Sequence, residues 1–102
     1  MIKNKRSSLP RRVDYTRTFA KSWERYNRAG RHDMPALIEA MTRLFHGGVL
    51  PASYRDHALQ GEQWDGAREL HIGGDFLLVY RHSPSQNLLT FIDIGTHSEL
   101  FG

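Results

Sequence analysis

The sequence predicts a two-layer α+β domain with the element order β-α-α-β-β-β, in which a helix hairpin packs on a mostly antiparallel sheet. Two observations predict this class. Between residues 16 and 45 the apolar residues recur at spacings of three and four, as they do on one face of a helix. After residue 66 they instead form three short runs separated by turn residues, which is typical of neighbouring strands. The 102 residues suffice for one such domain.

The first half of the chain is predicted to contain a short edge strand at residues 11–15, followed by two helices. The first helix runs from Thr16 to about Arg28 and ends at Ala29-Gly30. Its inner face consists of Phe19, Ala20, Trp23 and Tyr26. The second helix starts after the N-cap residue Asp33 and ends at Gly47-Gly48. Its apolar face consists of Leu37, Ile38, Met41, Leu44 and Phe45.

The second half is predicted to contain the rest of the sheet. Residues 49–66 are rich in turn formers and show no clear period. Strands are expected at residues 67–72, 76–81 and 88–94. The middle run is the most apolar of the three, so we expect it to be central.

Charge is distributed unevenly along the chain, although its net value is only +3. Residues 1–31 contain ten lysines and arginines against two acids, whereas residues 32–102 contain four arginines against nine acids. This pattern indicates either a polyanionic partner, most simply nucleic acid, or a solvated basic face. Residues 1–10 are polar, basic and end in proline, so we interpret them as a flexible arm and residues 11–102 as the folded domain.

Several classes of protein are excluded by what the sequence lacks. The absence of cysteine excludes disulfide scaffolds, thiolate metal sites and cysteine nucleophiles. No apolar run approaches the roughly 20 residues of a membrane span, and no apolar N-terminal segment is typical of a secretory signal. We therefore expect a cytoplasmic protein without a membrane partner.

Three histidines stand at the ends of predicted elements, where scaffolds often present functional groups. They are His57, His71 and His97. Histidine can accept and return a proton near neutral pH, which suits acid–base catalysis. Arg68 precedes His71 by three positions, so the two side chains point to opposite faces of a regular strand. A zinc hydrolase using the three histidines is an alternative, although no histidine pair has helical metal-site spacing.

The second half of the chain also resembles a known family. The matching segments keep one order and near-constant spacing: Tyr54-Arg55-Asp56-His57, Trp64, Gly66, Arg68-Glu69-Leu70-His71, Asp75–Tyr80, Gly95-Thr96-His97 and Leu100-Phe101-Gly102. They are similar to the YafQ branch of the RelE superfamily of bacterial type II toxins. The resemblance implies a RelE-like, microbial-RNase-like fold. It also implies a ribosome-dependent endoribonuclease that cleaves mRNA in the A site and needs no metal or other cofactor.

The resemblance further implies roles for particular residues. By position, the catalytic set is His57, His71, Asp75, His97 and Phe101. The RNA and phosphate contacts are Arg68, Arg81 and Phe76. His71 and His97 would share the acid and base roles, while the others orient groups or stack on a base. Taken alone, Asp75 is first of all a turn residue, and Phe76 and Phe101 are first of all core residues.

The implied partners are the ribosome, its mRNA and a cognate antitoxin. That antitoxin would be a ribbon-helix-helix protein with an acidic C-terminal segment, and the complex would bind operator DNA through the antitoxin. Two positions depart from the family pattern. Phe76 stands where relatives have tryptophan, and Asp93 stands where relatives often have arginine. Because Asp93 cannot stabilise a phosphate, the alternative is a non-catalytic member that binds antitoxin or ribosome without cleaving RNA.

Overall fold

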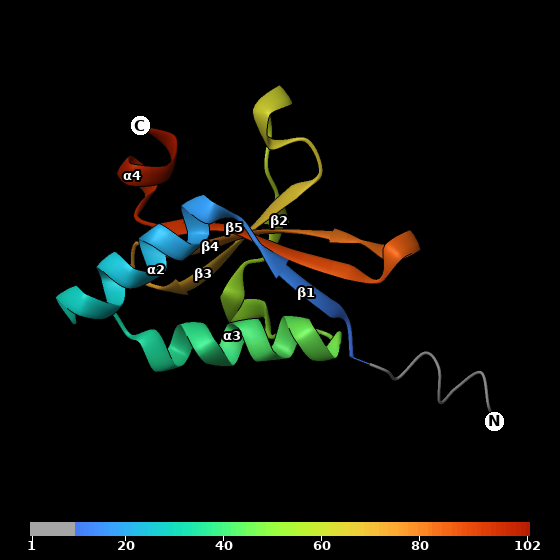
Figure 1. Cartoon of the computed structure of the whole chain (residues 1–102), viewed down its shortest axis with the longest axis horizontal. Helices are drawn as coiled ribbons and strands as arrows, with labels where there is room; N and C mark the ends of the chain where they lie inside the picture. Colours follow the sequence, from blue (N-terminus) through green and yellow to red (C-terminus); the bar gives the residue numbers. More distant parts are fainter. Residues whose placement is uncertain (1–9) are drawn as a thin grey trace.

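A five-stranded sheet with the strand order β1-β5-β4-β3-β2 forms the centre of the structure (Figure 1). The strands are β1 (Arg12–Tyr15), β2 (His57–Ala58), β3 (Ala67–Gly73), β4 (Phe76–Ser83) and β5 (Leu88–Gly95). β1 pairs in parallel with β5, and the other three pairs are antiparallel. The computed structural model describes residues 10–102, so the predicted arm lies outside the described residues except for Pro10.

A helix hairpin covers one side of the sheet, as predicted (Figure 1). α2 (Arg17–Ala29) starts at Thr16, whose Oγ1 accepts a hydrogen bond from the Phe19 N–H at 2.9 Å. α3 (Met34–His46) starts at Asp33, whose carboxylate accepts from the Ala36 N–H at 3.0 Å. Both helices end at a glycine with positive φ. These local signals explain why both boundaries agree with the prediction to within about a residue.

The core lies between the hairpin and one face of the sheet. Residues of α2 and α3 pack there against alternate residues of the three long strands, among them Phe19, Tyr26, Leu37, Ala40, Leu44, Leu70, Leu78, Phe91 and Ile94. One predicted core residue is placed wrongly, because Ile38 is 48% exposed while Met34 and Ala40 are buried. The two-layer α+β prediction is confirmed.

Three segments without a predicted element form regular structure. Residues 49–66 contain the short 3-10 helices η1 (Ala52–Tyr54) and η2 (Glu62–Trp64) and the strand β2 between them. A further 3-10 helix, η3 (Pro84–Gln86), connects β4 and β5. The last residues form α4 (His97–Phe101), whose N-cap Thr96 exchanges hydrogen bonds with Glu99. Across residues 10–102, every helix is too short or too polar to cross a membrane.

Candidate active site

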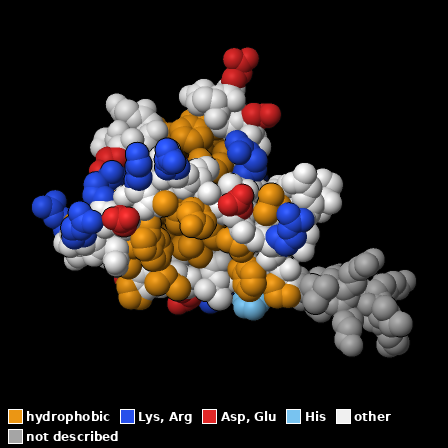
Figure 2. Space-filling view, viewed as in Figure 1, with side chains coloured by type: hydrophobic (Ala, Val, Ile, Leu, Met, Phe, Trp, Pro, Cys, Tyr) orange, Lys and Arg blue, Asp and Glu red, His pale blue; other side chains and the backbone are white. Residues whose placement is uncertain are grey.

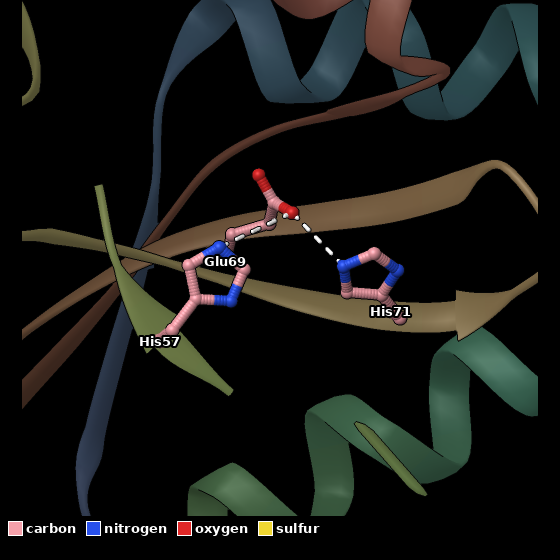
Figure 3. A group of neighbouring side chains, drawn as sticks. All are labelled: His57, Glu69 and His71. Carbon is pink, nitrogen blue, oxygen red and sulfur yellow. Dashed lines mark ion pairs between the residues drawn. The ribbon is translucent and has the colours of Figure 1, made fainter. Parts of the chain in front are cut away.

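Three imidazoles converge on one buried carboxylate at the face of the sheet opposite the helix hairpin. Glu69 Oε1 lies 3.1 Å from His71 Nε2, 3.7 Å from His57 Nε2 and 3.9 Å from His97 Nε2. The first two of these histidines flank Glu69 on the sheet surface (Figure 3). The structure thus brings together the three histidines selected from the sequence, although 40 residues separate the first from the last.

The elements of the sheet explain this convergence. His57 on β2 is the register partner of Glu69 on β3. His71 follows Glu69 by two positions, so both side chains lie on the same face of β3. His97 opens α4, directly beyond the end of β5.

Glu69 is the member of this cluster that sequence reasoning did not select. Its side chain is only 4% exposed, which is unusual for a carboxylate and requires compensating partners. The available signal was its position two residues before His71, on the same strand face. In the sequence, however, Glu69 also follows Arg68 and looks like half of a surface ion pair.

His97 is held by Asp75, which follows the β3–β4 turn. Asp75 Oδ1 accepts hydrogen bonds from the His97 backbone N–H at 3.0 Å and from its ring Nδ1 at 2.5 Å. These two hydrogen bonds hold the pKa of Asp75 below its ordinary value. Because an ionised carboxylate can only accept, Nδ1 carries a proton, and Nε2 is the ring nitrogen that faces Glu69.

A second histidine has the same tautomer. The Arg55 carbonyl accepts a hydrogen bond from His57 Nδ1 at 2.7 Å, so the His57 Nε2 also faces the centre of the cluster. His71 Nε2 lies 3.1 Å from Glu69 Oε1, and the other ring nitrogen points away from that carboxylate (Figure 3). All three rings therefore place a nitrogen at the same carboxylate.

Two aromatic rings border the cluster on the side of α4. Phe101 is 39% exposed, and its ring centroid lies 6.1 Å from that of His97. Trp64 of η2 packs edge-on against Phe101 with centroids 5.4 Å apart. Phe101 thus lies where a base-positioning ring is predicted, and Trp64 joins it without having been selected from the sequence.

Phe76, by contrast, does not fit its predicted contact with RNA. Its side chain is 2% exposed, and the His32 ring from the α2–α3 loop stacks on it at 4.5 Å and 13°. The Tyr26 ring covers it further at 5.2 Å. The prediction is wrong because a loop distant in the sequence occupies the face where a base would stack.

Arg68 also lies away from the histidine cluster, on the opposite face of β3. Asp56 accepts hydrogen bonds from its Nε at 3.1 Å and its Nη2 at 3.2 Å. The same carboxylate accepts from the Tyr80 hydroxyl at 2.7 Å. The bond to Asp56 raises the pKa of Arg68, and burial raises the pKa of Tyr80. Arg68 is therefore a structural residue that ties the loop before β2 to the sheet, which corrects its predicted phosphate role.

Replacing Asp56 with alanine is expected to destabilise the fold by about 2 kcal/mol, because the buried Tyr80 hydroxyl and the half-exposed Arg68 both lose their acceptor. Tyr80→Phe is the matched control. It removes one donor but leaves Asp56 paired with Arg68, so we expect a cost of about 1 kcal/mol. Urea unfolding monitored by circular dichroism measures both values. An Asp56→Ala cost no larger than that of Tyr80→Phe would contradict this role.

Arg81 remains available to a phosphate. It is the register partner of Ala67, on the face of the sheet that carries Glu69. Its Nε and Nη2 donate to the Asp65 carbonyl at 3.1 and 2.9 Å, which leaves its other terminal nitrogen without a partner in residues 10–102. Asp93 has a structural role, because its carboxylate accepts from Ser22 Oγ at 2.7 Å and so ties α2 to β5.

The cluster has the donor set of a metal site. One ligand atom each from His57, Glu69 and His71 lies within 4.8 Å of the others. Two imidazoles and a carboxylate suit a divalent transition metal, and they leave open positions for further ligands.

Comparison with known proteins places this chain in a family. A family model described as "Bacterial toxin of type II toxin-antitoxin system, YafQ" matches residues 11–102. The chain is 38% identical over 96 residues to "mRNA interferase toxin YafQ" of Escherichia coli K12, covering 92% of this chain and 99% of that one. The chain belongs to the YafQ family of bacterial type II toxins. The family expectation drawn from the motifs is thus confirmed.

Solved structures of YafQ proteins share the fold. The toxin in the crystal structure of the E. coli DinJ-YafQ toxin-antitoxin complex superposes with a TM-score of 0.82 at 36% identity, covering 92% of this chain and 100% of that one. A metal-bound toxin from Helicobacter pylori superposes with a TM-score of 0.79 at 31% identity, covering 89% and 99%. The YafQ-family chain described here therefore has the expected RelE-like fold.

Proposed function

We propose that this YafQ-family protein is a ribosome-dependent endoribonuclease that cleaves mRNA in the A site and thereby inhibits translation in the cytoplasm. The observation that carries the proposal is the convergence of three imidazoles on Glu69, with Asp75 orienting one of them. An E. coli relative is named an mRNA interferase, and its sequence aligns along nearly the whole of both chains.

The proposed reaction is a transesterification within the RNA. A base removes the proton from a ribose 2′-OH, and the 2′-oxygen attacks the adjacent phosphorus. The bond between phosphorus and the 5′-oxygen breaks, and an acid supplies a proton to that oxygen. The products are a 2′,3′-cyclic phosphate and a 5′-OH, so the step needs one proton acceptor, one donor and positive charge at the phosphate.

His97 is the proposed base. Its side chain is half exposed and can reach a substrate, and Asp75 holds Nδ1–H so that Nε2 carries the lone pair. This arrangement follows the logic of a catalytic triad, in which the carboxylate fixes the tautomer and balances the charge that forms on the ring. Asp75 is a positioning residue here.

His71 is the proposed acid. Its Nε2 lies 3.1 Å from Glu69 Oε1, so the opposite nitrogen is the one that we propose delivers a proton to the 5′-oxygen. His57 stands on the other side of Glu69 and assists in orienting the scissile group. Arg81 supplies positive charge, while Phe101 and Trp64 offer rings for positioning a base.

No step of this reaction passes through a metal. The metal-bound H. pylori relative and the spacing of His57, Glu69 and His71 support the proposal that a transition metal can occupy the cluster. A metal there would be coordinated by the ring nitrogens and the carboxylate oxygen, which would then no longer be free to exchange protons or orient the rings. We therefore infer that such a metal competes with catalysis.

The antitoxin is the second proposed partner, as in the E. coli DinJ-YafQ complex. An apolar groove of about 300 Å³ between α2 and β1 is lined by Val13, Tyr15, Phe19, Ala20, Trp23, Met41 and Phe91. Figure 2 shows this apolar area bordered by a row of Lys and Arg side chains over α2. An apolar groove with a basic rim fits an amphipathic antitoxin segment that carries acidic residues. We propose that this antitoxin is of the ribbon-helix-helix class and that the toxin–antitoxin complex binds operator DNA through it.

Mapping mRNA 5′ ends in a translating bacterial extract tests the proposed activity. We expect the added wild-type protein to produce new 5′ ends in frame with the codons, and none on the same mRNA without ribosomes. Cleavage should persist after treatment with a zinc-selective chelator that leaves magnesium on the ribosomes. Binding to ribosomes without new 5′ ends would support the non-catalytic alternative, and loss of cleavage with the chelator would support a zinc hydrolase.

A further inference from the structure

A second pocket, of about 350 Å³, lies between the C-terminal end of α2 and α4. Its lining includes Arg25 from α2 and Arg31 and His32 from the α2–α3 loop. From the other side it includes Thr96, Ser98 and Glu99. The pocket is thus built where the helix hairpin meets the end of the sheet.

The pocket is positively charged. Among residues 10–102, no carboxylate oxygen lies within ion-pair distance of Arg25 or Arg31, whereas Arg28 on the same helix pairs with Glu24 at 3.2 Å. The Arg25 guanidinium carbon lies 5.2 Å from the centre of the Tyr26 ring. Glu99 is the acid of the lining, and its Oε1 already accepts from the Thr96 N–H at 3.0 Å within α4.

The pocket borders both His97, the proposed catalytic base, and Asp75, which orients it. Thr96 and Ser98 of its lining flank His97 in the chain. The His32 ring stacks on Phe76, which directly follows Asp75. The pocket and the histidine cluster are therefore connected through residues 96–98 and through the stack of His32 on Phe76.

We propose that this pocket binds an mRNA backbone phosphate next to the scissile one, with Arg25 and Arg31 as its ligands. This inference rests on the proposed function and adds a substrate subsite to it. Guanidinium groups hold phosphate oxygens through paired, charge-assisted hydrogen bonds. Arg25 and Arg31 would add to the positive charge proposed for Arg81, since Arg68 is bound to Asp56 and position 93 carries an acid.

The test uses the double variant Arg25→Gln/Arg31→Gln in the full-length chain, with Arg28→Gln as the matched control on the same basic helix. Cleavage of A-site codons is measured on programmed ribosomes across salt concentrations. We expect KM to rise about tenfold in the double variant, with kcat within about twofold of wild type. The plot of log kcat/KM against log salt concentration should become less steep, by nearly the slope that one phosphate contact contributes. Arg28→Gln should leave these values close to wild type.

A modified mRNA distinguishes mRNA from ribosomal RNA as the source of the phosphate. Methylphosphonates replace, in turn, the phosphates on either side of the scissile one. In wild type one of these neutral substitutions should raise KM about tenfold, and in the double variant the same substitution should have no further effect. Equal KM values for the double variant and Arg28→Gln would overturn the subsite. It would also be overturned if the methylphosphonate raised KM as much in the double variant as in wild type. A wild-type protein that cuts no mRNA would instead overturn the proposed function.

Discussion

Replacing His97 with alanine is expected to lower the single-turnover rate of mRNA cleavage on programmed ribosomes by about a hundredfold to ten-thousandfold. The variant loses the ring nitrogen proposed to accept the 2′-OH proton, whereas ribosome binding, which uses other surfaces, should change little. Asp75→Asn is the matched control. It keeps the side-chain shape but removes the negative charge that fixes the His97 tautomer, so its loss should be smaller than that of His97→Ala.

The pH dependence follows from the direction of the Asp75 shift. Hydrogen bonds from His97 hold the pKa of Asp75 below the ordinary value of 3.8, so Asp75 stays ionised at all higher pH. Its contribution to stability is therefore present above about pH 4 and is lost as pH falls through the lowered value. An NMR titration of the Asp75 carboxyl carbon should accordingly show no protonation of that group between about pH 5 and 8. Protonation of Asp75 within that range would contradict an ionised Asp75.

A substrate with a better leaving group separates the base from the acid. When sulfur replaces the 5′-oxygen, departure needs little protonation. We expect this substrate to restore much of the activity of His71→Ala but not of His97→Ala. Restoration of His97→Ala alone would reverse the two assignments, and equal restoration of both would remove the division of roles.

Replacing Glu69 with glutamine is the change with the next largest expected effect, a rate loss of about a hundredfold. The amide preserves the size of the side chain but removes the negative charge that faces three imidazoles. The loss should appear in kcat rather than KM, because Glu69 is buried and does not reach the substrate.

The same variant separates catalysis from stability. Removing a charge buried at 3% exposure avoids a desolvation cost, so Glu69→Gln should unfold in urea at a concentration no lower than wild type. Zinc titration provides a second readout. Wild type should bind zinc and lose cleavage activity as it binds, and Glu69→Gln should bind it at least tenfold more weakly. Wild-type activity in Glu69→Gln would exclude Glu69 from the mechanism.

Much of the fold was predictable because its signals are local. Asp33 and Gly47 cap α3 through atoms a few residues away, and the alternation of apolar residues predicted the long strands to within about two residues. The short elements were not predictable. β2 has two residues and no period, and it exists because it pairs with β3, ten positions later in the chain.

For the site, the sequence by itself determined which residue types are available. It placed His57, His71 and His97 at element ends, and its motifs identified the family. Only the tertiary structure decided how these groups are used. Glu69 became the centre of the cluster because strand pairing and alternation put it among three rings, and Phe76 was covered by a loop from the hairpin. Arg68 turned to Asp56 on the other face. The physical reason is that the chemistry of a side chain is a local property. Its burial, its hydrogen-bond partners and the face of the sheet on which it lies depend on segments that meet only in the folded chain.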